Sequence, residues 1–292
     1  MISIIICTNT KLNNVFIKNI DETIGTRDYE IITIDTSQKK HSIHEAYNIG
    51  TEKAQYPFLC FLHNDIIFRT SNWGNLIIEA FKDKKIGVLG VIGAKTTMEY
   101  SWGWWENPFH EGCIIQNYSH NALNIPNKYI EETTPILKDV VVVDGMFLAL
   151  PKTIFKHISF DTKTYKGFHL YDSDICMQAI EKGYNVKVVK NILIEHYSYG
   201  NPDKYFSENM YKFYQKWKHK LPIYSKDIQE TEILQQRDIA IKHLFDSKSG
   251  AYNKSKNIEI NKTIQKNHLT IQLSIYLPKI IRKILLRPFS LS

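Results

Sequence analysis

The first ninety residues alternate between short apolar runs and segments with helical spacing. The apolar runs are rich in β-branched residues, which is typical of strands buried on both faces of a parallel sheet. Strands are predicted at residues 2–7, 30–34, 58–62 and 86–92, and helices at residues 15–24, 44–54 and 73–81. This order predicts an α/β fold with a mostly parallel, Rossmann-like sheet flanked by helices.

The regular alternation stops near residue 94. Residues 94–138 are rich in aromatic and polar residues and are expected to form a loop. Later strands are predicted at residues 140–150, 185–189 and 192–194, and later helices at residues 172–182 and 203–218. We therefore expect a main domain over residues 1–222 and a helical, basic C-terminal extension over residues 223–292.

The net charge of +7 is concentrated at the end of the chain. Residues 251–292 contain eight Lys or Arg residues and one acidic residue, whereas the rest of the chain is balanced. A neutral main domain disfavours nucleic acid as a partner. Apolar and basic positions share a helical pattern over residues 273–287, which predicts a peripheral contact with an anionic membrane surface. Packing on the protein itself, or a homodimer contact, is the alternative.

Several classes of protein are disfavoured by motifs that the sequence lacks. The four cysteines are isolated, which argues against zinc ribbons and redox motifs and favours reduced thiols in the cytoplasm. A dinucleotide fingerprint, a P-loop and a nucleophile elbow are all missing from the sequence. No apolar stretch is long enough to span a membrane, and the first residues lack the pattern of a signal peptide, so a cytoplasmic protein is expected.

Three predicted strands end in clusters of polar residues. These clusters are Thr8-Asn9-Thr10, Asp35-Thr36-Ser37 and His63-Asn64-Asp65. Because ligands bind at the carboxyl ends of strands in open α/β sheets, we expect the three clusters to share one binding site. Asp35 is suited to accept hydrogen bonds from a ribose or a base. Asp65 is suited to bind Mg²⁺ or Mn²⁺, which would neutralise a diphosphate.

The same residues carry a resemblance to a known family. The first strand, Asp35, residues 47–51 and the strand that ends in His63-Asn64-Asp65 resemble the nucleotide-sugar-binding half of GT-A glycosyltransferases, most of all the family 2-like group. The second half of the chain adds three matching segments: residues 143–147, the acidic motif at residues 167–175, and His196. The resemblance covers about residues 1–220 and implies the GT-A fold.

The resemblance also implies a reaction and roles for particular residues. The reaction is inverting sugar transfer from a nucleotide-diphosphate sugar, with UDP as the first choice, to a glycan or lipid-linked acceptor in surface polysaccharide synthesis. The enzyme would work in the cytoplasm or at the inner face of the membrane. The implied residues are Asp172 as catalytic base, Asp65 and His196 as contacts to a divalent cation, and Thr8, Thr10, Asp35, Asn48, Asn64 and Asp174 as contacts to the donor.

The sequence departs from the family pattern at two places. His63 stands where the metal motif usually has its first Asp, so Asp65 is the main expected ligand and a direct role of His63 stays open. The second strand ends in Asp-Thr-Ser, which has one carboxylate fewer than the family pattern and leaves the base specificity open.

Each assignment has a purely structural alternative. Asp172 and Asp174 begin a predicted helix, where aspartates cap free N–H groups. His196 and Asn48 could be ordinary packing residues. Trp102, Trp104 and Trp105 could form a stacking platform for the acceptor or could anchor a loop.

Two other functions remain in view. A nucleotide-sugar- or glycan-binding scaffold without turnover would explain the altered metal motif. A nucleotidyltransferase shares the sheet topology, but the Gly-rich basic loop that it needs after the first strand is missing from the sequence.

Overall fold

A seven-stranded mixed sheet forms the centre of the computed structural model, which describes residues 1–98, 109–118, 121–124, 130–198, 205–229 and 231–233. Its strand order is β11-β14-β5-β13-β3-β1-β2. The strands are β1 (Ile2–Thr8), β2 (Tyr29–Asp35), β3 (Phe58–Leu62), β5 (Ile86–Gly90), β11 (Leu137–Val140), β13 (Phe147–Pro151) and β14 (Asn185–Val189). All run in one direction except β13 and β11, so the sheet is largely parallel.

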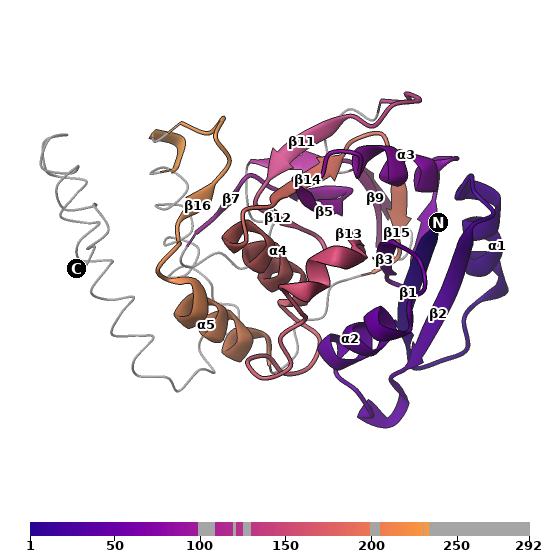
Figure 1. Cartoon of the computed structure of the whole chain (residues 1–292), viewed down its shortest axis with the longest axis horizontal. Coiled ribbons are helices and arrows are strands. Elements are labelled where there is room, and N and C mark those ends of the chain that lie inside the picture. The colour runs from indigo at the N-terminus through magenta and orange to yellow at the C-terminus, as the bar shows by residue number, and fades with distance from the viewer. Residues whose placement is uncertain (99–108, 119–120, 125–129, 199–204, 230, 234–292) are drawn as a thin grey trace, which may run out of the picture. The chain divides into compact units, whose positions relative to one another are not determined.

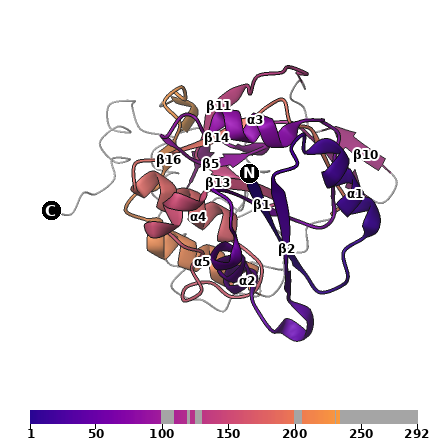
Figure 2. The same ribbon diagram turned by 45° about the vertical axis from the view of Figure 1, so that its right-hand side comes forward.

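Helices cover both faces of this sheet (Figures 1 and 2). The helices are α1 (Asn14–Thr23), α2 (Ile43–Lys53), α3 (Trp73–Ala80), α4 (Tyr171–Glu181) and α5 (Phe206–Trp217), with short 3₁₀ turns η1 (Ser37–Lys39) and η3 (Lys152–Lys156). In both views α1 and α3 lie on one side of the sheet, and α2, α4 and α5 lie on the other. The predicted α/β fold is confirmed.

Local sequence explains how α2 begins and how closely it packs. Ser42 caps the helix in a capping box with Glu45, in which each side chain bonds to the backbone of the other. A Cβ at Gly50 would lie 2.3 Å from Cγ2 of Ile5, so only glycine allows this approach of helix to strand. These two features hold α2 tightly against β1.

Within the described residues, three smaller sheets accompany the central one. The four-stranded sheet has the order β10-β9-β15-β4. The smaller strands are β4 (Ile66–Phe68), β6 (Ile92–Ala94), β7 (Thr96–Thr97), β8 (His110–Gly112), β9 (Ile114–Tyr118), β10 (Asn121–Asn124), β12 (Val142–Val143), β15 (Ile194–His196) and β16 (Ile223–Tyr224). The expectation of a loop over residues 94–138 is therefore wrong, because the described part of that segment contains several short strands.

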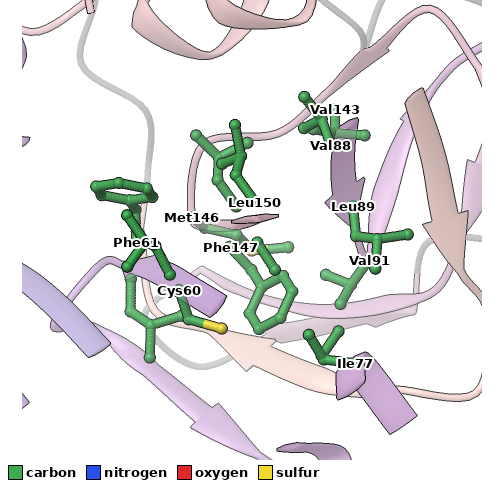
Figure 3. Packing of buried hydrophobic residues seen from close by; sticks show 14 of the residues in the cluster. Cys60, Phe61, Ile77, Val88, Leu89, Val91, Val143, Met146, Phe147 and Leu150 are labelled. Carbon is green, nitrogen blue, oxygen red and sulfur yellow. The ribbon is translucent and has the colours of Figure 1, made fainter. Parts of the chain in front are cut away.

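The core lies between the central sheet and its helices. Ile2, Ile4, Ile5 and Ile6 of β1 are all fully buried, as a central strand covered on both faces requires. Figure 3 shows Phe61, Leu89, Phe147 and their neighbours packed together at the middle of the sheet. This rigid core supports the strand ends where the candidate site lies.

The remaining predictions of secondary structure have different outcomes. The predicted strands and helices of the first ninety residues are present. Residues 223 and 224 form a strand where helical content was expected. Trp102, Trp104, Trp105 and the amphipathic segment 273–287 lie outside the described residues. Within the described residues, none of the helices has the length and apolar character needed to cross a bilayer.

Candidate active site

Backbone pairing brings two distant segments together at the ends of β3 and β15. His63 follows β3, and its backbone N–H donates to the carbonyl of Met146 at 3.0 Å. The antiparallel pairing of β15 with β4 sets His196 opposite Ile66. The N–H of Tyr197 donates to the carbonyl of Asp65 at 2.8 Å, which places Asp65 beside His196.

The side chains of His63, Asp65 and His196 form one compact group. One ligand atom from each lies within 4.8 Å of the others. Oδ1 of Asp65 is 3.5 Å from Nε2 of His196 and 3.8 Å from Nδ1 of His63. Oδ1 of Asp65 and Nε2 of His196 are buried and have no hydrogen-bond partner among the described residues. Burying such atoms unpaired costs free energy, so the group suits a cation.

The charges of this group support the same assignment. Burial opposes ionisation of Asp65, but the imidazoles of His196 and His63 outweigh it and hold the pKa of the carboxyl below its ordinary value. Burial lowers the pKa of His63, despite the neighbouring Asp65 and Asp144. In His196, by contrast, burial is outweighed by the contact with Asp65 and by the charges of Asp144 and Asp65, which raise the pKa of the imidazole. A divalent metal takes the carboxylate and the deprotonated imidazoles, so its binding would release the proton of His196.

His196 is oriented by Gln116 on the neighbouring strand β9. Nε2 of Gln116 donates to the carbonyl of Ser198 at 2.7 Å, which turns its Oε1 toward Nδ1 of His196 at 3.3 Å. The ring proton of His196 then belongs on Nδ1. In the neutral ring, the lone pair on Nε2 then faces Asp65 at 3.5 Å, where a metal would take it, as an outer partner of this kind usually ensures.

Asp172 lies in the first turn of α4, directly after Tyr171, whose hydroxyl is 2.6 Å from Nε2 of His63. Its Oδ2 accepts from the N–H of Gly145 at 3.1 Å and its Oδ1 from the N–H of Ser173 at 2.7 Å. Burial and the nearby carboxylate of Asp144 raise the pKa of Asp172 to about 7. A carboxyl group with this pKa can both accept and release a proton near neutral pH.

The other strand ends form a polar edge next to the group. In the register of β1 with β2, Thr8 pairs with Asp35. The amide of Asn64 donates to Oγ1 of Thr8 at 3.0 Å, and the N–H of Thr10 donates to the same oxygen at 3.2 Å. Thr8, Thr10, Asp35 and Asn64 are thus brought together as predicted from their strand-end positions.

Asp35 is exposed at this edge and is held in one orientation. Its two carboxylate oxygens accept from the N–H of Ser37 at 2.8 Å and from the Ser37 hydroxyl at 3.0 Å. These bonds lower the pKa of Asp35, so the group is ionised at neutral pH. An oriented, exposed carboxylate suits the hydroxyls of a ribose.

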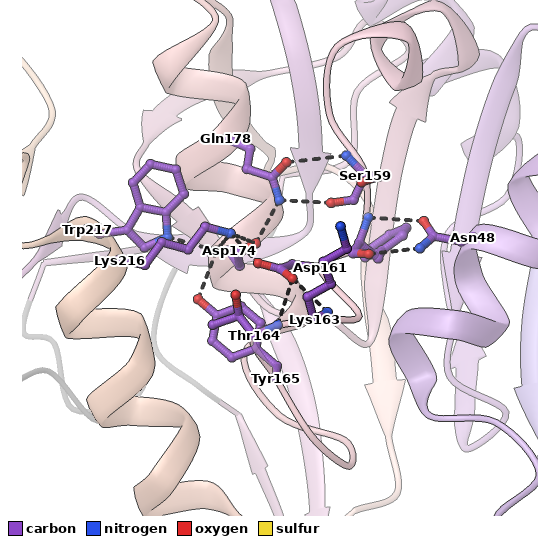
Figure 4. A network of polar contacts seen from close by, with 11 residues as sticks. Asn48, Ser159, Asp161, Lys163, Thr164, Tyr165, Asp174, Gln178, Lys216 and Trp217 are labelled. Atoms are coloured by element: carbon purple, nitrogen blue, oxygen red, sulfur yellow. Dashed lines mark hydrogen bonds and ion pairs between the residues drawn. The ribbon is translucent and has the colours of Figure 1, made fainter.

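Asn48 is occupied by a contact within the protein. Its Nδ2 donates to the carbonyl of Phe160 at 2.8 Å, and its Oδ1 accepts from the N–H of Phe160 at 3.1 Å (Figure 4). The geometry gives Asn48 a structural role, in which it ties α2 to the segment before α4, instead of the expected donor contact.

Asp174 points into a buried polar cluster with Tyr165, Lys216 and Trp217 (Figure 4). Its carboxylate accepts from Tyr165, Lys216, Trp217 and Gln178 at 2.7–2.9 Å and is 1% exposed. No oxygen of this carboxylate faces solvent, so the geometry replaces the expected donor contact with a structural role, in which Asp174 joins α4 to α5.

Three residues of this site were not predicted from the sequence with the role that their contacts indicate. His63 was left open as a ligand because the family pattern has Asp there, yet its ring nitrogen belongs to the group. Asp144 influences the pKa of His196 and of Asp172. Gln116 lies in a segment that was expected to be a loop, and only the strand pairing reveals it.

Comparisons with known proteins identify a family and several solved structures that are similar to the chain. A model described as "Glycosyltransferase like family" matches residues 3–218. Solved structures similar to the chain include S. aureus TarS (12% identity, 88% of this chain and 46% of that one, TM-score 0.49). Others are GalNAc-T7 with UDP, GalNAc and Mn²⁺ (12%, 84% and 56%, 0.48) and A197 from STIV (12%, 68% and 86%, 0.42).

The structural matches and the family match cover different shares of the proteins compared. The chain spans about half the length of TarS and of GalNAc-T7, and no curated protein matches it. The largely parallel sheet with helices on both faces is GT-A-like. The family match covers most of the chain, and the residues of the candidate site lie within it. The chain therefore belongs to the glycosyltransferase-like family.

Proposed function

We propose that this protein is an inverting, metal-dependent glycosyltransferase that uses a nucleotide-diphosphate sugar. The observation that carries the proposal is the compact group of His63, Asp65 and His196, next to a carboxyl group whose pKa is about 7. In this group Oδ1 of Asp65 and Nε2 of His196 are buried without a hydrogen bond. A metal site beside a general base is what sugar transfer from a nucleotide diphosphate requires.

The three ligand residues would hold Mn²⁺ in preference to Mg²⁺. Two of the three ligand atoms are imidazole nitrogens. Imidazole suits transition metals, whereas Mg²⁺ prefers oxygen ligands and keeps its water. When bound, the ion would supply positive charge that stabilises the departing diphosphate.

The polar edge would bind the donor. Asp35 would accept hydrogen bonds from the ribose, and Thr8, Thr10 and Asn64 would line the path toward the diphosphate. We take a UDP-sugar as the first donor to test. The sugar itself is not specified by these contacts.

Asp172 would act on the acceptor. Its carboxylate takes the proton of an acceptor hydroxyl while that oxygen bonds to the anomeric carbon. The bond from that carbon to the diphosphate breaks on the opposite side, and the nucleoside diphosphate leaves, so the configuration inverts. A glycan or a lipid-linked sugar, as in surface polysaccharide synthesis, would be the acceptor.

We also propose that residues 1–222 form the catalytic domain. Residues 223–292 would be an appendage whose segment 273–287 contacts the inner face of the membrane. A non-catalytic scaffold was suggested by the altered metal motif. We favour the enzyme over the scaffold, because a ring nitrogen of His63 lies close enough to Asp65 and His196 to act as a third ligand.

Thermal unfolding with UDP, GDP, dTDP, CMP and ADP, each with and without Mn²⁺, tests the proposal. A ligand at about 100 times its Kd adds about 2.7 kcal/mol to the free energy of unfolding, which is visible as a shift in Tm. We expect a Mn²⁺-dependent shift with one nucleoside diphosphate, and its loss in Asp65→Asn. Equal Tm values under all conditions would contradict the proposal.

A further inference from the structure

The hydroxyl of Tyr171 is buried between the metal-suited group and the turn that precedes β13. Tyr171 is the first residue of α4 and is 4% exposed. Its Oη lies 2.6 Å from Nε2 of His63, the ring nitrogen that faces away from Asp65. The Tyr171 ring packs edge-on against His44, Tyr47 and Phe168. The hydroxyl is therefore held in place from several sides.

Gly145 explains how the hydroxyl reaches this position. A Cβ at residue 145 would lie 2.1 Å from Oη of Tyr171 and 2.4 Å from its Cζ. Any larger residue would push the phenol away from His63. The N–H of Gly145 also donates to Asp172, at 3.1 Å. One glycine thus accommodates the phenol of Tyr171 and holds the carboxylate of Asp172.

The proton on the His63 ring decides whether His63 can be a ligand. Nδ1 of His63 faces Asp65 at 3.8 Å. This nitrogen can bind a cation only if the ring proton sits on Nε2, where it needs an acceptor. The oxygen of Tyr171, 2.6 Å from Nε2, is placed to be that acceptor. Gln116 performs the equivalent task for His196.

We propose that Tyr171 is a positioning residue that keeps the proton of His63 on Nε2 and so makes Nδ1 a metal ligand. The inference rests on the proposed metal site. Because Tyr171 directly precedes Asp172, the same turn of α4 sets the metal ligand and the catalytic base. Assembly of the metal site and placement of the base are thereby coupled.

The first test is the Mn²⁺ affinity of full-length Tyr171→Phe, measured by the electron paramagnetic resonance signal of free Mn²⁺. We expect the Kd to rise by about 10- to 100-fold, the usual effect of removing an outer partner of a ligand. Gly145→Ala, which displaces the hydroxyl without removing it, is expected to weaken binding as well. A Tyr171→Phe Kd equal to that of the wild type would overturn the proposal.

Tyr165→Phe is the matched control. It also removes a buried hydroxyl, but one that donates to Asp174 at 2.9 Å. We expect it to lower Tm and leave the Mn²⁺ affinity unchanged. If both variants weaken Mn²⁺ binding equally, the effect is general loosening and the proposal fails.

The second test reads the ring proton directly and needs no metal. Nitrogen NMR of ¹⁵N-histidine-labelled protein, with the His63 signals assigned by a His63→Gln variant, shows which nitrogen is protonated. We expect Nε2–H in the wild type and a shift of the population toward Nδ1–H in Tyr171→Phe. A proton on Nδ1 in the wild type contradicts the role of Tyr171. A wild type with Nε2–H that fails to bind Mn²⁺ would instead overturn the proposed metal site and, with it, the role of His63 as a ligand.

Discussion

The carboxyl group of Asp172 lies where its surroundings work against its ionisation. Burial and the charge of Asp144 raise its pKa, and bonds from the N–H groups of Ser173 and Gly145 offset only part of that effect. An ordinary aspartate, with a pKa near ~3.9, is a weak base. With a pKa of about 7, Asp172 is a much stronger base and is still half ionised at neutral pH.

The pH dependence of sugar transfer follows from this value. Only the ionised form of Asp172 can take a proton, so kcat/KM is expected to rise with pH around a midpoint near 7. Asp172→Asn should lower kcat by about 10²- to 10⁴-fold while the protein still binds nucleotide. Rates between pH 5.5 and 8.5, measured by release of the nucleoside diphosphate, check both. A flat profile in the wild type would contradict the assignment.

Residue spacing explains why the two aspartates of the acidic motif have different surroundings. Asp172 and Asp174 are two positions apart at the start of α4. Successive helical residues turn by about 100°, so positions i and i+2 point to nearly opposite sides. Asp172 therefore faces the site, whereas Asp174 faces α5 and the side chains of Trp217 and Lys216.

The residues that hydrogen-bond to the candidate ligands could not be identified from the sequence. The order and spacing of the motifs made Asp65, Asp172 and His196 the candidates for the site. Gln116 and Tyr171 act only through contacts between distant segments, at sequence separations of 80 and 108 residues. Such contacts depend on the register of strands, which a single sequence does not give.

At the scale of elements, α2 carries a buried histidine that lacks polar partners. Both ring nitrogens of His44 are buried without a hydrogen bond among the described residues, and the ring stacks on Tyr165 at 5.6 Å. Burial lowers the pKa of His44 to about 4. The ring is therefore neutral in the native protein at neutral pH.

Acid stability should respond to this histidine. Its native pKa is lower than its unfolded value of 6.5, so between pH 6.5 and about 4 the unfolded chain binds the extra proton. The free energy of unfolding is therefore unaffected by protonation of His44 above pH 6.5. As pH falls from 6.5 to about 4, it decreases by up to about 3 kcal/mol because of this residue. Urea unfolding at pH 7 and pH 4.5 should show a smaller acid loss in His44→Phe. His219→Gln changes a histidine at an exposed position and should lose as much stability between pH 7 and pH 4.5 as the wild type. If His44→Phe also loses as much stability as the wild type, the buried, neutral ring is contradicted.

The contact between α2 and the segment before α4 gives a separate prediction. Asn48→Ala removes two hydrogen bonds and leaves the N–H and C=O of Phe160 unpaired. We expect the free energy of unfolding to fall by about 1–3 kcal/mol, measured by urea unfolding. Nucleotide affinity, measured in the same variant, should stay within a few-fold of the wild type. A large loss of affinity with unchanged stability would restore the ligand contact that the sequence suggested.

Long helices and strands with a regular pattern of apolar residues were easier to predict than short strands without one. The long apolar strands and the amphipathic helices of the first ninety residues were predicted closely. Strands β8 and β10, with sequences His-Glu-Gly and Asn-Ala-Leu-Asn, have no alternation of apolar and polar residues. Their pairing partners, not their own sequences, make them strands.

At the scale of the whole molecule, the direction of two strands could not be predicted. β13 is fully apolar and buried except at its last residue, like the parallel strands β3 and β5 between which it lies. An apolar run looks the same whichever way it enters a sheet. The reversal of β13 matters because the turn before it, with Asp144 and Gly145, is thereby brought to the carboxyl ends of the parallel strands, beside Asp172 and Tyr171.

Several weak sequence signals converge in this architecture. Strand ends supply Thr8, Asp35 and His63, a small second sheet supplies His196, and the start of α4 supplies Asp172. Each segment alone has an ordinary structural explanation. These segments meet at one edge of the sheet, where the proposed cation site lies next to the proposed base.

The most direct test of that account is metal-dependent release of nucleoside diphosphate from a nucleotide sugar. Purified full-length protein is incubated with a panel of UDP-sugars and a mixture of glycan acceptors, with Mn²⁺ or with a chelator. The account predicts release with Mn²⁺, abolition by the chelator, and losses in both His196→Ala and Asp172→Asn, of which only His196→Ala weakens Mn²⁺ binding. Release that persists in the chelator, or that survives Asp172→Asn unchanged, would contradict it.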